Sequence, residues 1–179
     1  MPLCTFTGTG HLASLLALLL VAGCSGPEAP PCPLQASAEA APSAGCFAVK
    51  DGALLVVEGM NGKLSPPGGS VETGEGARCA AFRETWEETG LRLQPGELID
   101  VFETGFHLYY CAHHENSGLI DPPPRMEVRR AFYLPLAEFD QWSWRFPGQE
   151  QVLASHLRRF TSPAGPATPE SPPAVPETR

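Results

Sequence analysis

Residues 69–91, GSVETGEGARCAAFRETWEETGL, combine three closely spaced carboxylates with the spacing of a helix. Glu84, Glu87 and Glu88 stand at positions i, i+3 and i+4, which share one helical face because 3.6 residues complete a turn. Like charges at this spacing repel one another, so a helix gains nothing from them unless a cation lies between them. Converging carboxylate oxygens are the ligands that Mg²⁺ or Mn²⁺ prefers. The alternative is a solvated acidic face, the usual role of a charge run.

The remaining positions of this helix suggest two unlike sides. The side of Glu84 and Glu88 carries small residues that would leave room for a ligand: Ala77, Ala80 and Ala81. The opposite side carries an apolar stripe that would pack against the protein: Cys79, Phe82 and Trp86. Gly68 and Gly69 follow two prolines, which predicts a tight turn whose backbone can approach a phosphate or offer a carbonyl to a metal. Gly90 stands where a helix ends in a left-handed residue.

The spacing G-x5-E-x7-R-E-U-x-E-E-x-G-U, with U a bulky aliphatic residue, resembles the signature of the Nudix hydrolases. The matching residues are Gly69, Glu75, Arg83, Glu84, Glu87, Glu88, Gly90 and Leu91. Thr85 departs from the pattern at the first U position, where its methyl group can still pack. The preceding GKLSPPGGSVE is similar to the family's lead-in, and the resemblance covers about residues 44–160.

This resemblance implies a single α/β domain, an α/β/α sandwich with a mixed β-sheet. It implies a Mg²⁺ or Mn²⁺ site formed by Glu84, Glu87, Glu88 and the Gly68 backbone, with Arg83 orienting the site through Glu75. The resulting catalytic candidates are Glu87, Glu84, Arg83 and Glu127. The general base is either a glutamate of the signature or Glu127, which corresponds to an accessory metal-binding glutamate of MutT-like members. An exposed charge on an edge strand is an equal alternative for Glu127.

Substrate recognition is less clearly encoded. FPGQE resembles the segment that contacts the base in MutT-like relatives, which makes Gln149 a candidate for base recognition. Trp144 and Phe146 could stack on a base, although capping the core is the favoured role for such aromatics. The net charge of −8 argues against a long nucleic-acid partner. The expected function is Mg²⁺-dependent hydrolysis of a nucleoside diphosphate linked to another moiety. The alternative is a non-catalytic nucleotide-binding or interaction module, and neither reading specifies the oligomeric state.

The composition divides the chain into four segments. Residues 1–23 resemble a bacterial lipoprotein signal peptide, because an apolar run too short to span a bilayer ends in Val-Ala-Gly-Cys, with Cys24 the lipidated residue. The signal contains no Lys or Arg, and an ordinary secretory signal or a buried N-terminal helix is the alternative. Residues 24–43 and 161–179 are rich in Pro and Ala and are predicted to be disordered, flanking a domain at 44–160. The expected location is the bacterial cell envelope, on the outer membrane or the periplasmic face, where linked nucleoside diphosphates suit the compartment better than free triphosphates.

The cysteines support export. Removal of the signal leaves Cys32, Cys46, Cys79 and Cys111 besides Cys24, an even number that allows three disulfide pairings. Cys79 could meet Cys111 while Cys32 meets Cys46, and the alternative is four small core residues. No CxxC zinc motif occurs.

Local patterns predict the other elements. Residues 46–58 are two apolar runs separated by Asp51-Gly52, a strong hairpin signal. Further strands are expected at 98–101, 104–112 and 127–136, and a helix at 149–160. A mixed sheet with one helix on either side follows.

Overall fold

The computed structural model describes residues 28–34, 39–124 and 127–162, called below the described part of the chain. Its elements are, in chain order, β1 (Ser43–Phe47), β2 (Val49–Lys50), β3 (Ala53–Gly59), β4 (Leu64–Ser65), β5 (Gly68–Ser70), α1 (Ala77–Thr89), β6 (Gln94–Val101), β7 (Phe106–Ala112), β8 (Val128–Pro135), the 3₁₀ helix η1 (Leu136–Gln141) and α2 (Gln149–Thr161).

The strands form two sheets. The first has the order β5-β1-β7-β6, with β1 and β7 parallel and the other neighbours antiparallel. In the second, β3 pairs antiparallel with β2 and β4 and, along its whole length, with β8. The expected mixed sheet is therefore present, but the strands divide into two sheets at Ala48. The carbonyl of Ala48 accepts a hydrogen bond from the Leu55 amide at 2.9 Å, so the chain exchanges β7 for β3 as its partner there.

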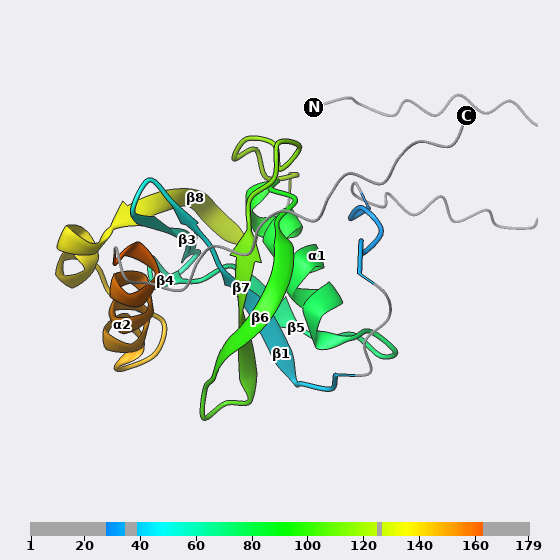
Figure 1. Ribbon diagram of the computed structural model, residues 1–179, viewed down its shortest axis with the longest axis horizontal. Helices are drawn as coiled ribbons and strands as arrows, with labels where there is room; N and C mark the ends of the chain where they lie inside the picture. Colours follow the sequence, from blue (N-terminus) through cyan, green and yellow to red (C-terminus); the bar gives the residue numbers. More distant parts are fainter. Residues whose placement is uncertain (1–27, 35–38, 125–126, 163–179) are drawn as a thin grey trace, which may run out of the picture.

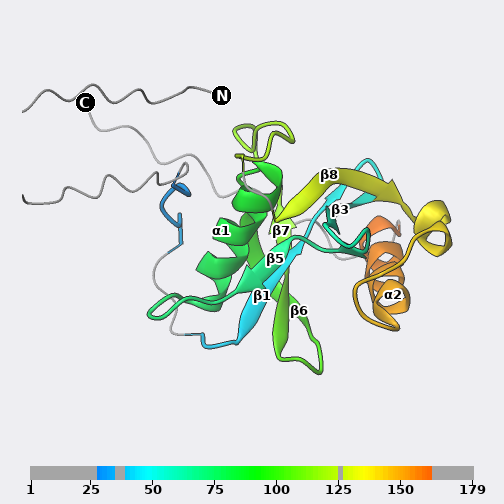
Figure 2. The same cartoon turned by 180° about the vertical axis from the view of Figure 1, so that it is seen from behind.

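The two helices lie on opposite sides of the strands, as Figures 1 and 2 show. α1 packs against β1 and β5, and its alanines join the cluster that contains Ala44, Cys46 and Leu55. α2 contributes Leu153 and Leu157 to a second cluster, built around residues of β1, β3 and β7. This single mixed α/β domain confirms the predicted fold class.

The hairpin signal is confirmed in detail. Asp51 and Gly52 both have positive φ, 51° and 76°, which is the conformation that a two-residue type I′ turn requires. The turn joins Lys50 of β2 to Ala53 of β3, which are paired. The other predicted strands and the C-terminal helix are also present, with ends that differ by a few residues.

Two disulfides connect the chain, Cys32–Cys79 and Cys46–Cys111, each with a Cα–Cα distance of 5.4 Å. The suggested pairs Cys79–Cys111 and Cys32–Cys46 are therefore wrong. Cys46 and Cys111 lie on the adjacent parallel strands β1 and β7, in the interior of the protein. The fold thus brings together residues that are 65 positions apart in the sequence.

The predicted disordered linker 24–43 needs a correction over its described residues. Cys32 is bonded to α1, the Glu39 carbonyl accepts a hydrogen bond from the Ala77 amide at 2.9 Å, and the Pro42 carbonyl accepts one from Val71 at 3.2 Å. These contacts place residues of that segment on the domain. The signal sequence, Cys24 and the tail beyond residue 162 lie outside the described residues. The helices that the structure describes are too short or too polar to cross a bilayer.

Candidate active site

The alanine side of α1 faces the sheet and does not leave room for a ligand, contrary to the prediction. Ala77, Ala80 and Ala81 have no exposed surface and pack in one cluster with Ala44 and Ala48 of the neighbouring strand segment. Small residues on both surfaces let the helix lie close to the sheet. The bulkier opposite side, with Cys79 and Phe82, is instead beside the segment around Cys32.

Further along α1, the sheet-facing side carries Glu84 and Glu88, which are buried against β5. The backbone of β5 consists of glycines at this point. A Cβ atom placed on Gly69 would lie 2.5 Å from the Glu84 carboxyl carbon, so a larger residue cannot occupy this position without displacing the carboxylate. The Gly68 amide donates a hydrogen bond to Glu88 Oε2 at 2.8 Å. The predicted contribution of the Gly68 carbonyl to a metal remains a prediction.

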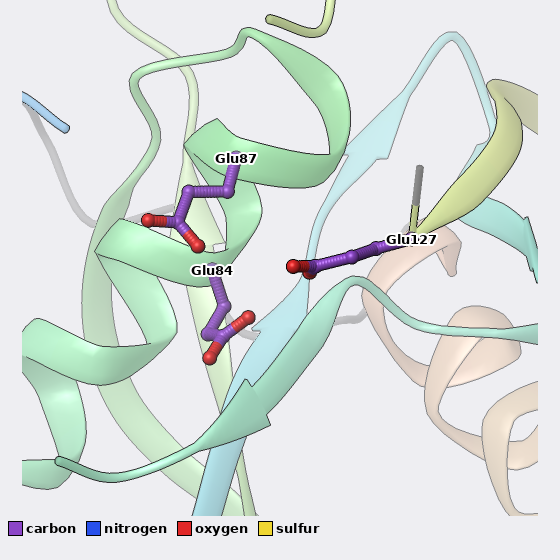
Figure 3. A group of neighbouring side chains, drawn as sticks. All are labelled: Glu84, Glu87 and Glu127. Carbon is purple, nitrogen blue, oxygen red and sulfur yellow. The ribbon is translucent and has the colours of Figure 1, made fainter. Parts of the chain in front are cut away.

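Glu84, Glu87 and Glu127 form the acid cluster, in which one oxygen atom of each lies within 4.8 Å of the other two. Figure 3 shows the carboxylates of Glu84 and Glu87, from α1, with that of Glu127 pointing toward them from the start of β8. The residues come from segments about 40 positions apart in the sequence, so their convergence is a product of the fold. Opposite ligands of one Mg²⁺ ion lie ~4.2 Å apart, so this upper limit of 4.8 Å is compatible with ligands of a single ion. An all-carboxylate set of this size fits a hard divalent cation.

Arg83 pairs with Glu75, as predicted, and also donates hydrogen bonds to two carboxylates of the acid cluster. Its guanidinium donates to both Glu75 oxygens, at 3.0 and 2.9 Å, to Glu84 at 2.9 Å and to Glu87 at 3.4 Å. It also donates to the Ser70 carbonyl at 2.8 Å. Burial alone would raise the pKa of Glu75, but the hydrogen bonds from Arg83 and the Glu72 amide outweigh it and lower this pKa. Arg83 is only 16 % exposed, so this network is more than a solvated surface ion pair.

The remaining carboxylates repel one another in a poorly solvated space. Burial raises the pKa of Glu84, helped by the charges of Glu87 and Glu127 and opposed by Arg83. Burial likewise raises the pKa of Glu88 to about 8, although the Gly68 amide opposes the shift. Raised carboxyl pKa values mean that the protein without an ion does not fully stabilise these negative charges. A bound cation would supply the missing positive charge.

Comparison with known proteins identifies the family to which this domain belongs. The family model described as NUDIX domain matches residues 40–155, well over half of the chain. The chain belongs to the Nudix family. A MutT-like protein of Streptomyces ambofaciens is 39 % identical over 61 residues, which are 34 % of this chain and 40 % of that protein. The chain thus spans less than half of this relative's length.

Solved structures share the Nudix fold of the chain. An ADP-ribose pyrophosphatase from Streptococcus suis superposes with a TM-score of 0.56 and 16 % identity, covering 69 % of this chain and 94 % of that one. A UDP-X diphosphatase gives a TM-score of 0.53 and 20 % identity, covering 70 % and 66 %. At these identities the superpositions establish the common fold.

The three predicted substrate residues of the Nudix domain have different positions. Trp144 is buried, donates its indole N–H to the Phe139 carbonyl at 3.0 Å and packs against the Phe139 ring, so it is a core residue, the favoured alternative. Phe146 and Gln149 instead line a cavity of about 230 Å³, which we call the ring pocket. Its other lining residues are Ser43, Ser65, Pro66, Gly68, Gly69, Ser70, Phe102, Thr104, Phe106 and Arg145.

The ring pocket suits a planar group that can donate a hydrogen bond. Phe102, Phe106 and Phe146 supply aromatic surface, and Phe102 and Phe106 contact each other edge to face. Gln149 is 5 % exposed, and its Oε1 has no hydrogen-bond partner in the described part of the chain. A buried acceptor without a donor is costly, so it favours a ligand that supplies an N–H.

Arg145, Phe102 and Phe106 also line the ring pocket and were not predicted from the sequence. Phe106 belongs to a predicted strand, and its orientation could be read only from the register of β1 and β7. Arg145 precedes the FPGQE segment, and nothing in its sequence context marks it. A larger open groove of about 1070 Å³ lies between η1 and α2, but none of the carboxylates of the acid cluster line it.

Gly69→Ala tests the close approach of β5 to the acid cluster. We expect Mn²⁺ affinity to fall by about 10–100-fold, the usual cost of disturbing a group that orients metal ligands, because the new methyl group displaces the Glu84 carboxylate. Titration calorimetry with Mn²⁺ measures this change. Ser70→Ala is the matched control, since Ser70 is the exposed next residue of β5 and the carbonyl that accepts from Arg83 is unchanged by the substitution. Equal affinities for wild type and Gly69→Ala would contradict the prediction.

Glu88→Gln tests the raised pKa of Glu88. A carboxyl group that binds its proton more tightly in the folded state lowers stability as pH rises, here from about 4.5 to about 8. In metal-free protein we therefore expect the urea midpoint of Glu88→Gln to exceed that of wild type at pH 8.5 and to approach it at pH 4.5. Saturating Mg²⁺ should reduce or reverse the difference at pH 8.5, because only the carboxylate gains from the ion. A pH-independent difference would show that Glu88 does not titrate in this range.

Proposed function

We propose that this Nudix domain hydrolyses the phosphoanhydride bond of a nucleoside diphosphate linked to a second moiety, with Mg²⁺ or Mn²⁺ as cofactor. The convergence of Glu84, Glu87 and Glu127 beside the glycine backbone of β5 carries this proposal. Gly68 and Gly69 of β5 also line the ring pocket. A bound ring and its diphosphate could therefore occupy adjoining sites.

Glu84, Glu87 and Glu127 would hold the ion, with Glu88 next to them on the Gly68 amide. A bound divalent cation neutralises phosphoryl charge and lowers the pKa of bound water. Arg83 fixes the orientation of Glu84 and Glu87 through its hydrogen bonds. Burial of Glu84, Glu87 and Glu88 keeps bulk water from competing for these charges.

We assign proton transfer to Glu127, which would contact the ion through one oxygen and accept the proton on the other. Glu84 and Glu87 both accept hydrogen bonds from Arg83, whereas no side chain in the described part of the chain donates to Glu127. Its exposure also gives access to water. The water oxygen bonds to phosphorus, its proton passes to Glu127, and the bridging P–O bond breaks with its electron pair remaining on the departing phosphate.

The nature of the solved relatives supports the substrate class. An ADP-ribose pyrophosphatase and a UDP-X diphosphatase share the fold, and the names of both describe diphosphates that join a nucleoside to another group. In this chain, the unsatisfied Gln149 oxygen and the aromatic walls of the ring pocket would recognise the base. At about 230 Å³ the pocket is smaller than the ~300–1,000 Å³ of sites that enclose a whole ligand, which suits one ring of a larger substrate.

A panel of ADP-ribose, UDP-sugars, dinucleoside polyphosphates and nucleoside triphosphates tests the proposal. With Mg²⁺ or Mn²⁺ we expect a nucleoside monophosphate and a second phosphate ester from the linked diphosphates, and slower release from triphosphates. Chromatography of the products distinguishes hydrolysis of the linked diphosphates from hydrolysis of the triphosphates. Absence of turnover on every member, with either ion, would overturn the proposal. Tight nucleotide binding without turnover would favour the non-catalytic module.

We also propose that the domain is exported and anchored through Cys24. The Val-Ala-Gly-Cys sequence that ends at Cys24 resembles a lipoprotein cleavage site and supports the anchor. The two disulfides are typical of oxidising compartments and support export. Labelling cells with a radioactive fatty acid tests the anchor, since Cys24→Ala should lose the label. Label retained in that variant would exclude lipidation at Cys24.

A further inference from the structure

Arg145 lines the groove between η1 and α2 and also two smaller cavities. The ring pocket lies on one side, and on the other lies a cavity of about 300 Å³, here called the acid-side cavity, whose lining includes Glu88, Glu127 and Lys63. Ser65 and Arg145 are the residues that line both. A ligand with its ring in the first cavity and its charged group in the second must pass Arg145.

The backbone of Arg145 is firmly placed although its side chain is exposed. Its amide donates to the Leu64 carbonyl at 2.8 Å, and the Leu64 amide donates to Ser143 at the same distance. The intervening Trp144 is anchored in the core. The guanidinium lies 5.6 Å from the centre of the Phe146 ring, which is itself part of the ring pocket. Arg145 therefore projects from a fixed base at the edge of that pocket.

Charge distinguishes Arg145 from the other cations near the site. It is the single charged residue among those that line the ring pocket. Arg83 is already engaged by three carboxylates, whereas no described side chain accepts a hydrogen bond from the Arg145 guanidinium. Arg145 lines the acid-side cavity together with Glu88 and Glu127, so its charge lies near the acidic side. A planar guanidinium with available donors is well suited to a phosphate group.

The geometry points to Arg145 as the residue that binds the phosphate next to the nucleoside, which makes it a specificity residue for nucleoside phosphates over uncharged nucleosides. This inference rests on the proposed function, because it places the nucleoside in the ring pocket and the diphosphate at the acid cluster. The contacted phosphate carries its charge before and during the reaction. Loss of Arg145 should therefore raise KM more than it lowers kcat.

Equilibrium binding tests the inference separately from catalysis. Calorimetry in magnesium buffer would compare the four ribonucleoside 5′-monophosphates with their nucleosides, on wild type, Arg145→Gln and Arg145→Lys. We expect wild type to prefer the best monophosphate over its nucleoside by about 10–100-fold, the effect of hydrogen bonds between charged groups. Arg145→Gln should remove this preference without changing nucleoside affinity, and Arg145→Lys should retain part of it.

Arg158→Gln is the matched control, because Arg158 is an exposed arginine that lines only the groove between η1 and α2. An unchanged preference in Arg145→Gln, or a wild type that does not prefer the monophosphate, would overturn the inference. A preference that depends on Arg158 would instead place the nucleotide in that groove and would also overturn it. A preference that depends on Arg145 in a protein that hydrolyses nothing would sustain the inference while the proposed activity fails.

Discussion

Glu87→Gln is expected to lower kcat by about 10²–10³-fold, the largest effect of any single substitution considered for this Nudix domain. Glu87 is 8 % exposed, belongs to the acid cluster and accepts a hydrogen bond from Arg83. The amide keeps the shape of the side chain but removes one negative charge and one acceptor, so the ion is held less tightly. Steady-state kinetics on the best substrate of the panel, over a Mg²⁺ titration, would measure the loss.

The same variant should remain folded, which separates a catalytic effect from a structural one. Removal of one of several mutually repelling carboxylates does not weaken the metal-free protein, so its thermal midpoint should equal or exceed that of wild type. Glu97→Gln is the control, since Glu97 is an exposed carboxylate on β6. Turnover of Glu87→Gln within a few-fold of wild type, with unchanged Mg²⁺ dependence, would remove Glu87 from the reaction.

Replacement of both Cys46 and Cys111 by alanine is expected to lower the free energy of unfolding by about 2–5 kcal/mol. The bond closes a loop of 65 residues, which corresponds to about 4 kcal/mol of lost entropy in the unfolded chain. Both cysteines are almost fully buried, so the replacement also loses packing in the interior. Equilibrium unfolding in guanidinium chloride, compared with wild type under non-reducing conditions, measures the difference.

The Cys32–Cys79 bond provides the matched comparison. It closes a loop of similar length, 47 residues, but it fastens a peripheral segment to the outer side of α1. Release of that segment in the folded state recovers part of the chain entropy. The double alanine variant at Cys32 and Cys79 should therefore lose less stability than the variant at Cys46 and Cys111. Equal losses would mean that residues 28–34 contribute to the fold as much as the central strands.

Local signals in the sequence were sufficient for several elements and for the Nudix family. The Asp51-Gly52 turn depends on two adjacent residues, and Gly90 ends α1 with φ of 77°, as expected for its position. The pairing of Arg83 with Glu75 followed from the family resemblance and is present. Glu127 also lies where the resemblance placed it, beside the signature glutamates, although its role in catalysis remains a proposal.

The errors concern contacts between distant segments. The larger side chains of α1 were expected to form its packing side and the alanines to leave room for a ligand, but the alanine side packs on the sheet because β1 is also built of small residues there. The Cys46–Cys111 pair depends on the adjacency of β1 and β7, which no local pattern specifies. The division of the strands into two sheets depends on one residue, Ala48, whose change of partner has no signal in the sequence.

The position of Glu28 affects which substrates the acid cluster could reach. Glu28 and Cys32 line one cavity of about 360 Å³ together with Arg83 and Glu87, so the start of the described chain lies beside the acid cluster. Three residues lie between Cys24 and Glu28, and the four steps from one to the other span at most about 14 Å even when fully extended. On the proposed lipid attachment at Cys24, the short tether would turn the acid cluster toward the bilayer surface. Diphosphate headgroups embedded in that surface would then be within reach, as well as solutes that diffuse past it.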